Sequence, residues 1–189
     1  MEIEIYFGDI FICQADAIVN PANIQTSLNF GSHISQKIKK NGGSLVINER
    51  KQKGTINLGD AVYTSGGNLH FRYIIHAAIL DMYDFNPLFL LKIRYRTSGD
   101  VLRNATLNSL IVASELKIKS IVFSLMGSGI GGMPIKKCAE IMLNEIISYF
   151  NINKGTILNK VIFAIKNKHD YRIVCEIKEN LKKLVSQHS

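Results

Sequence analysis

Hydrophobic and polar positions along the chain switch repeatedly between a period of two and a period near 3.6. At the N-terminus Ile3, Ile5 and Phe7 alternate with Glu4 and Tyr6, which predicts an edge or half-buried strand. Short apolar runs predict further strands at residues 16–20, 61–64, 73–78, 120–125 and 161–165. The proline at position 21 is expected to stop the second strand. The run 120–125 is apolar on both faces, as is typical of a central strand in a covered sheet.

Helical periodicity fills most of the intervals between these strands. Helices are predicted at residues 32–40, 44–51, 100–116, 134–150 and 170–185. The first is expected to end at Asn41-Gly42-Gly43, and Pro134 occupies a favoured place in the first turn of the fourth. This alternation predicts a single α/β domain over residues 1–189, with helices on both faces of a mixed, largely parallel sheet.

The composition favours a globular protein kept in a reducing compartment. Apolar residues make up 47% of the 189 positions, enough for a core without disulfide or metal staples. Cys13, Cys138 and Cys175 lie far apart and lack CxxC spacing, so we expect neither a disulfide nor a zinc site. The opening MEIEIYF is acidic where a signal peptide is basic, and no apolar run approaches the roughly 18 residues that span a bilayer. We therefore expect a cytoplasmic protein with no membrane contact, metal or cofactor.

The charge balance is basic. Lys and Arg number 23 against 15 Asp and Glu, which gives a formal net charge of +8. Such a surplus favours an anionic partner, for example a nucleotide or a nucleic acid. Lysine-rich stretches at residues 37–40 and 178–183 are equally typical of solvated helix faces. Charge alone leaves both interpretations open.

Four loops that follow predicted strands could carry a ligand, because ligands of covered α/β sheets bind outside the carboxyl ends of the strands. These loops are Gly8–Ile10, Asn20–Ile34, Gly66–Asn68 and Gly127–Gly132. In the first, Asp9 either caps the turn or accepts hydrogen bonds from an exocyclic amino group such as that of adenine. In the second, the amides of Asn20 and Asn23 either belong to a proline turn or bind sugar hydroxyls.

The fourth loop has four glycines in six residues between a strand and a helix. This arrangement presents backbone N–H groups and a positive helix end to one spot, as a diphosphate cradle does. Gly127, Gly129 and Gly132 match GxGxxG, but a dinucleotide-binding site of that type wants an acidic residue where this chain has Lys166. A Walker A loop is excluded because no Gly-Lys-Ser/Thr follows. The remaining alternative is a tight turn without a ligand.

These loops, in this order, resemble those of the macrodomain family, which binds ADP-ribose. The resemblance covers nearly the whole chain and rests on Gly8 to Asn23, Gly59 to Ala78, and Ser120 to Pro134 with the helix after it. It implies a three-layer α/β/α sandwich around a mixed, mostly parallel six-stranded sheet.

The resemblance also implies a role for each loop residue. Asp9 would hold the adenine amino group beside the Ile10 backbone, and Asn20 and Asn23 would lie near the distal ribose. The residues implied at the first phosphate and ribose loop are Gly31, Ser32, His33 and Ile34. Those implied to cradle the diphosphate through backbone amides are Met126, Gly127, Ser128, Gly129, Ile130 and Gly131. His76 matches a family position on a strand, and we interpret it as a core histidine bonded to backbone.

The chain departs from the family pattern at three places. The first phosphate loop is glycine-poor, so Ser32 and His33 would crowd a diphosphate unless they hydrogen-bond to it. Ser35 stands where the best-known hydrolytic members place an aspartate. Lys166 stands where many members have an aromatic residue near the adenine, and it could contribute a cation–π or phosphate contact.

The resemblance implies that the partner is ADP-ribose or an ADP-ribosylated macromolecule. Whether the chain also hydrolyses such a substrate stays open. The catalytic hypothesis has Asn23 hold a water near the anomeric carbon while His33 acts as general acid or base. The alternatives are a reader that binds ADP-ribose without turnover and, ranked last, a basic nucleic-acid-binding domain.

Overall fold

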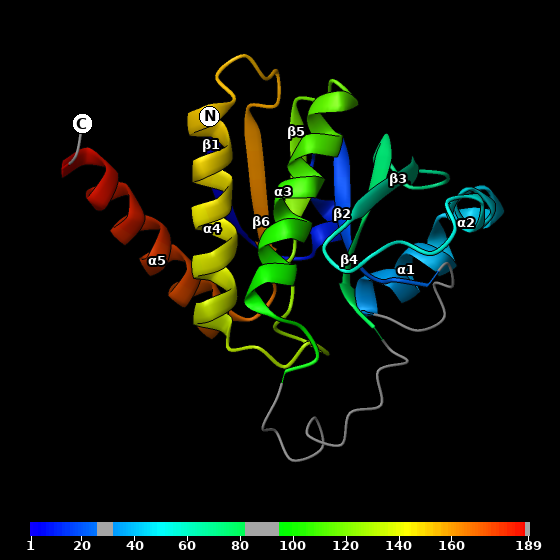
Figure 1. The fold of residues 1–189 in the computed structure, drawn as a ribbon, viewed down its shortest axis with the longest axis horizontal. Helices are drawn as coiled ribbons and strands as arrows, with labels where there is room; N and C mark the ends of the chain where they lie inside the picture. Colours follow the sequence, from blue (N-terminus) through cyan, green and yellow to red (C-terminus); the bar gives the residue numbers. More distant parts are fainter. Residues whose placement is uncertain (26–31, 82–94, 188–189) are drawn as a thin grey trace.

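Six strands form one mixed sheet, in the order β1-β6-β5-β2-β4-β3, in the computed structural model, which describes residues 1–25, 32–81 and 95–187 (Figure 1). All neighbouring strands are parallel except β3, which runs antiparallel to β4. The strands are β1 (Glu2–Phe7), β2 (Ala17–Asn23), β3 (Ala61–Ser65), β4 (Tyr73–Leu80), β5 (Ser120–Phe123) and β6 (Lys160–Ile165). The helices are the short 3-10 helix η1 (Ile10–Ile12), α1 (His33–Asn41), α2 (Gly43–Gln52), α3 (Gly99–Glu115), α4 (Ile135–Ile152) and α5 (Lys168–Gln187).

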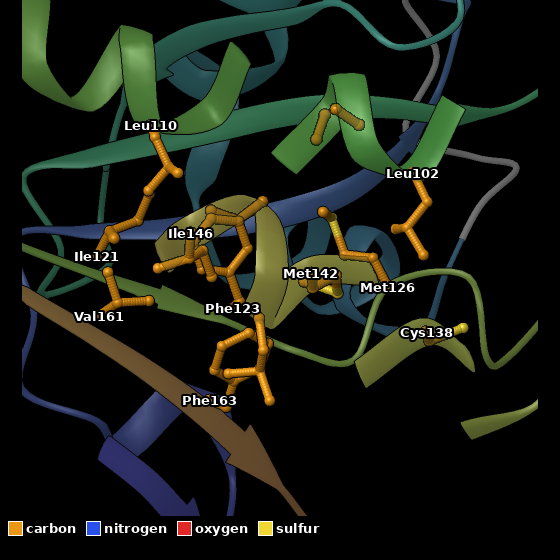
Figure 2. Packing of buried hydrophobic residues seen from close by; sticks show 14 of the residues in the cluster. Leu102, Leu110, Ile121, Phe123, Met126, Cys138, Met142, Ile146, Val161 and Phe163 are labelled. Carbon is orange, nitrogen blue, oxygen red and sulfur yellow. The ribbon is translucent and has the colours of Figure 1, made fainter. Parts of the chain in front are cut away.

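Alternation along the central strands divides the core into two layers, one on each face of the sheet. Ile121, Phe123 and Phe163 point to the face covered by α3 and α4, where Figure 2 shows them packed among side chains of both helices. Their neighbours Val122 and Ile162 point to the opposite face, which α1 and α2 cover. The fold class inferred from the sequence is therefore confirmed: an α/β sandwich around a mixed, mostly parallel sheet.

The helices begin and end where local sequence signals place them. Ser32 caps α1, since its Oγ accepts a hydrogen bond from Ser35 N at 3.2 Å. Gly42 ends α1, and Pro134 precedes the first residue of α4. Within the three described ranges, no helix combines the length and apolarity that crossing a membrane requires.

The prediction that Pro21 stops the second strand is wrong. β2 continues through Pro21, opposite Ala77 of β4, to Asn23. Its pairing with β5 is confined to Ala17 and Ile18. The proline therefore lies where only one flank of β2 has a strand partner, and its missing N–H is tolerated there.

The expectation that Gly66–Asn68 joins the other loops at the ligand-binding edge is also wrong. Because β3 is antiparallel, Ser65 pairs with Tyr73 at the start of β4, so this turn lies at the opposite end of the sheet. The glycines of this turn instead allow other backbone segments to pack closely against it. A Cβ at Gly66 would lie 1.7 Å from the carbonyl oxygen of Phe71, and one at Gly67 would lie 2.0 Å from that of Gly42.

Candidate functional site

A pocket of about 280 Å³ opens at the carboxyl ends of β1, β5 and β6, against the N-terminal turn of α1. Its walls are largely apolar and include Ile10, Phe11, Ile34, Leu125, Ala164 and Ile165. Polar side chains interrupt this surface, namely Asp9, His33, Lys37, Ser124, Ser128, Lys166, Asn167 and Asp170. An apolar slot with a few convergent polar groups suits a flat heterocycle that carries polar substituents.

Asp9 is held at this pocket by the turn that follows β1. Gly8 N donates to Ile165 O at 3.0 Å and so extends the ladder between β1 and β6 by one bond. Asp9 then caps η1, its Oδ1 accepting a hydrogen bond from Phe11 N at 3.1 Å. The cap was predictable from the sequence, but the 3-10 helix, which is only three residues long, was not.

Two lysines converge on the carboxylate of Asp9. Lys37 Nζ and Lys166 Nζ each lie 2.9 Å from Oδ2. Burial by itself would raise the pKa of Asp9. The hydrogen bonds from Lys166, Lys37 and Phe11 N outweigh that effect and hold the pKa well below its ordinary value. Asp9 therefore stays ionised across the physiological pH range.

Lys37 is one of the pocket residues that sequence reasoning missed, because it was interpreted only as part of a basic stretch. It lies four residues after His33 on α1, so both side chains share one helix face, and both line the pocket. The four-residue spacing between His33 and Lys37 was the sequence pattern from which this position could have been predicted. Lys37 Nζ also lies 5.1 Å from the centre of the Phe11 ring.

The glycine-rich loop after β5 forms a tight turn beside the pocket. Gly127 and Gly132 have φ angles of +84° and +74°, and Gly132 N donates to Gly129 O at 3.0 Å. No carbonyl of the described residues accepts a hydrogen bond from the N–H groups of Ser128, Gly129 or Ile130. These three donors meet the requirement of the predicted cradle.

Not every residue of this loop reaches the pocket. Ser128 lines it, whereas Gly129 and Ile130 are exposed beyond it. The side chain of Met126 is buried in the core beside α4, so only its backbone could serve a ligand. Gly131 is buried, and a Cβ there would lie 2.5 Å from Gly127 O, so a glycine closes the turn.

Asn20 belongs to a buried hydrogen-bond network, and its side chain does not line the pocket. Its Nδ2 lies 3.1 Å from His76 Nδ1, and its Oδ1 accepts a hydrogen bond from Ser35 Oγ at 2.8 Å. On the other side of the imidazole, Thr64 Oγ1 lies 3.1 Å from His76 Nε2. His76 is thus a core histidine as expected, but its partners are side chains and not the backbone.

Burial controls the ionisation of this histidine. His76 is fully buried, and desolvation, with a smaller contribution from the nearby charge of Arg50, lowers its pKa to about 3. A neutral imidazole has one donor and one acceptor nitrogen, which two polar neighbours satisfy. The network around Asn20 therefore stabilises the sheet and leaves no polar atom of His76 for a ligand.

The remaining predicted residues of the second loop differ in how they are placed. Asn23 ends β2 at 2% exposure and is not among the pocket-lining residues. Ser32 lies at the start of α1, where its Oγ donates to Pro21 O at 3.1 Å. His33 is exposed at the pocket rim, and Ile34 forms part of the wall. Gly31 lies outside the described residues.

Ser35 occupies the position at which the resemblance implies an aspartate in hydrolytic members. It is 1% exposed and donates to Asn20 within the buried network. Among residues 1–25, 32–81 and 95–187, no three His, Cys, Asp or Glu side chains gather as a metal site would require.

Comparison with known proteins identifies a family. A family model of the Macro domain matches residues 19–142 of the chain. A macro domain-containing protein of Caldanaerobacter subterraneus is 31% identical over 186 residues, which cover 96% of this chain and 98% of that protein. Among solved structures, a macrodomain variant of Oceanobacillus iheyensis with ADPR has a TM-score of 0.77 at 26% identity, covering 96% of this chain and 94% of the other.

Other relatives are longer than this chain. An uncharacterized protein of Mycobacterium tuberculosis is 32% identical over 165 residues, which make up 87% of this chain but 41% of that protein. In that protein the matching segment lies within a chain more than twice the length of the match.

Proposed function

This chain belongs to the macrodomain family, and on that premise we propose that it binds ADP-ribose, with the adenine in the pocket beside Asp9. One observation carries the proposal: residues chosen from separate loops of the sequence line a single pocket. Asp9 comes from the loop after β1, His33 from the start of α1, Ser128 from the loop after β5, and Lys166 from the end of β6.

The chemistry of the pocket supports this orientation of the ligand. The walls formed by Ile10, Ile34 and Ala164 suit the faces of an adenine ring. Asp9 supplies an acceptor for the exocyclic amino group. The N–H groups of Ser128 to Ile130 would hold the diphosphate, and each hydrogen bond to a charged group contributes about 1.5–3 kcal/mol.

Binding is tested by calorimetric titration with ADP-ribose, AMP and single-stranded DNA at two salt concentrations. We expect micromolar affinity for ADP-ribose, which corresponds to about −8 kcal/mol. Asp9→Ala should weaken that affinity by about 1–3 kcal/mol, or roughly 5- to 150-fold, because the adenine amino group loses its acceptor. Asp100→Ala, at a carboxylate in the first turn of α3 with 85% side-chain exposure, is the matched control.

Two results would overturn the proposal. The first is the absence of heat with ADP-ribose at millimolar concentration. The second is DNA binding that weakens steeply with salt while ADP-ribose fails to compete, which would favour the nucleic-acid alternative.

Hydrolysis is a second candidate function, favoured by the place of His33 at the pocket rim. In this mechanism the exposed imidazole of His33 would transfer protons near the distal ribose, and Asn23 would hold the attacking water. Ser35 supplies no carboxylate, so this activity would depend on the histidine.

The test compares release of ADP-ribose from a mono-ADP-ribosylated protein by the wild type and by His33→Ala. A fall of tenfold or more in kcat with unchanged affinity supports catalysis by His33. Equal turnover removes His33 from the mechanism. A wild type that binds ADP-ribose without releasing it is a reader of ADP-ribosylated macromolecules.

A further inference from the structure

Most of the acceptor capacity of Asp9 is already filled by the protein. Lys37 and Lys166 both donate to Oδ2 at 2.9 Å, and Phe11 N donates to Oδ1 at 3.1 Å. A carboxylate offers about four lone-pair sites, so these contacts with described residues fill three of them. The remaining acceptor site lies on Oδ1.

The same contacts bring donors to this end of the pocket. Each ammonium group has three N–H donors and directs one of them to Asp9. Both lysine side chains line the pocket and are 33% and 57% exposed, so their other N–H groups remain accessible to a ligand. The polar end of the pocket therefore offers one acceptor beside several donors.

Purines differ in what they present to such an edge. A 6-amino purine has a donor at position 6 and an acceptor at N1, whereas a 6-oxo purine has an acceptor at position 6 and a donor at N1. A lone carboxylate would bind the first and repel the carbonyl oxygen of the second. A carboxylate flanked by two ammonium groups can pair with either, because an acceptor and a donor are both within the same site.

We propose that Lys37 and Lys166 determine base specificity, and that they allow the pocket to accept a 6-oxo purine as well as a 6-amino purine. The inference rests on the proposed function, since it assumes that the base of a nucleoside diphosphate ribose lies beside Asp9. The ligand it adds is inosine diphosphate ribose, in which the carbonyl oxygen accepts a hydrogen bond from a lysine and N1–H donates to Asp9.

The experiment measures the dissociation constants of ADP-ribose and inosine diphosphate ribose by calorimetry. The wild type should bind the two within tenfold of each other. In the double variant Lys37→Met/Lys166→Met the ratio should move at least tenfold in favour of ADP-ribose, because the carbonyl oxygen loses its charged donors. The single variant Lys166→Met, which changes a side chain 57% exposed, provides the same readout if the double variant is unstable.

The matched control is Lys40→Met/Lys168→Met. Like the test variant, it replaces two lysines and so lowers the net charge by two. Lys40 is exposed on α1 and Lys168 is the exposed first residue of α5, and neither residue lines the pocket. Its ratio should equal that of the wild type.

Each outcome decides between the inference and the proposed function. A wild type that prefers ADP-ribose by more than tenfold overturns the inference and leaves the function intact. The inference is also overturned if the ratio of the two dissociation constants changes less than tenfold in the Lys37 and Lys166 variants. An equal change of that ratio in the control variant overturns it as well. A wild type that binds neither ligand overturns both.

Discussion

Two polar clusters in the described part of the chain differ in how their polar atoms are used. Asp9, Lys37 and Lys166 form a partly exposed ionic cluster that lines the pocket. Asn20 and His76 belong to a buried network in which polar atoms pair with one another. Asp9 follows a strand that has ended and lines the pocket, whereas Asn20 lies within a strand that continues and does not line it.

The course of β2 explains the difference. The strand continues for three residues beyond Asn20, so this side chain lies inside the sheet with a strand partner in His76. β1 instead ends at Phe7, and the chain turns at Gly8 before Asp9. Asp9 is therefore presented at the edge, where a ligand can reach it.

The largest effect is expected from His76→Ala in the buried network. The substitution leaves a cavity and removes partners from Asn20 and Thr64, so the free energy of unfolding should fall by about 3 kcal/mol or more. Urea denaturation measures the loss. The affinity of the folded fraction for ADP-ribose should change less than threefold. A large loss of affinity without a loss of stability would place His76 in the site instead.

The buried network should also make stability depend on pH. The folded-state pKa of His76, about 3, lies below its ordinary value of 6.5, so the unfolded chain binds a proton that the folded chain does not. Stability from this group is complete above pH 6.5 and decreases as the pH falls toward 3, by at most about 1.4 kcal/mol per unit.

His76→Gln removes this titration. The difference in unfolding free energy between wild type and variant should therefore narrow as the pH is lowered from 7 to 5. Parallel curves over that range would show that the pKa of His76 is the same in the folded protein as in the unfolded chain.

The glycine-rich loop offers a similar contrast between a constrained and an open position. Gly127 has a positive φ, and an added Cβ would lie 3.3 Å from Cys138 Sγ, so Gly127→Ala should destabilise the fold by about 1 kcal/mol or more. Gly129 has no atom within 4 Å of such a Cβ. Gly129→Ala should change stability by less than about 0.5 kcal/mol. Thermal unfolding of the two variants is the comparison, and equal losses would contradict the described turn.

A small stability effect is also expected at the pocket cluster. Asp9→Ala breaks two ion pairs, but Asp9 keeps 28% exposure and Lys166 57%, so solvent screening limits their contribution to less than about 1 kcal/mol. Chemical denaturation should thus show a small change in the variant whose ADP-ribose affinity falls most. If the Asp9→Ala variant were unfolded under native conditions, the cluster of Asp9, Lys37 and Lys166 would be required for the stability of the fold.

The sequence predicted the architecture well because the pattern of apolar and polar residues along a strand follows which of its side chains are buried. Val122 faces one core and Phe123 the other, so a run apolar on both sides correctly indicated a covered central strand. The direction of β3 could not be predicted from the sequence. A strand of five residues with a turn at one end does not determine which neighbouring strand it pairs with. The turn at Gly66 was consequently assigned to the wrong end of the sheet.

The pocket was predictable only in part. Asp9 and Lys166 follow strands and could be placed from the order of elements. Their ion pair could not be predicted, because it joins residues 157 positions apart and no local sequence pattern indicates it. Lys37 resembled any lysine on a solvated helix face. Its place in the pocket follows from the packing of α1, which brings Lys37 Nζ to within 2.9 Å of Asp9 Oδ2 and which tertiary structure determines.

A crystal structure of the chain with ADP-ribose tests the central claim most directly. We expect the adenine between Ile10 and Ile34 with its amino group on Asp9, and the diphosphate on the N–H groups of Ser128 to Ile130. A structure with the ligand bound away from Asp9, or with the pocket empty at saturating ADP-ribose, would contradict it.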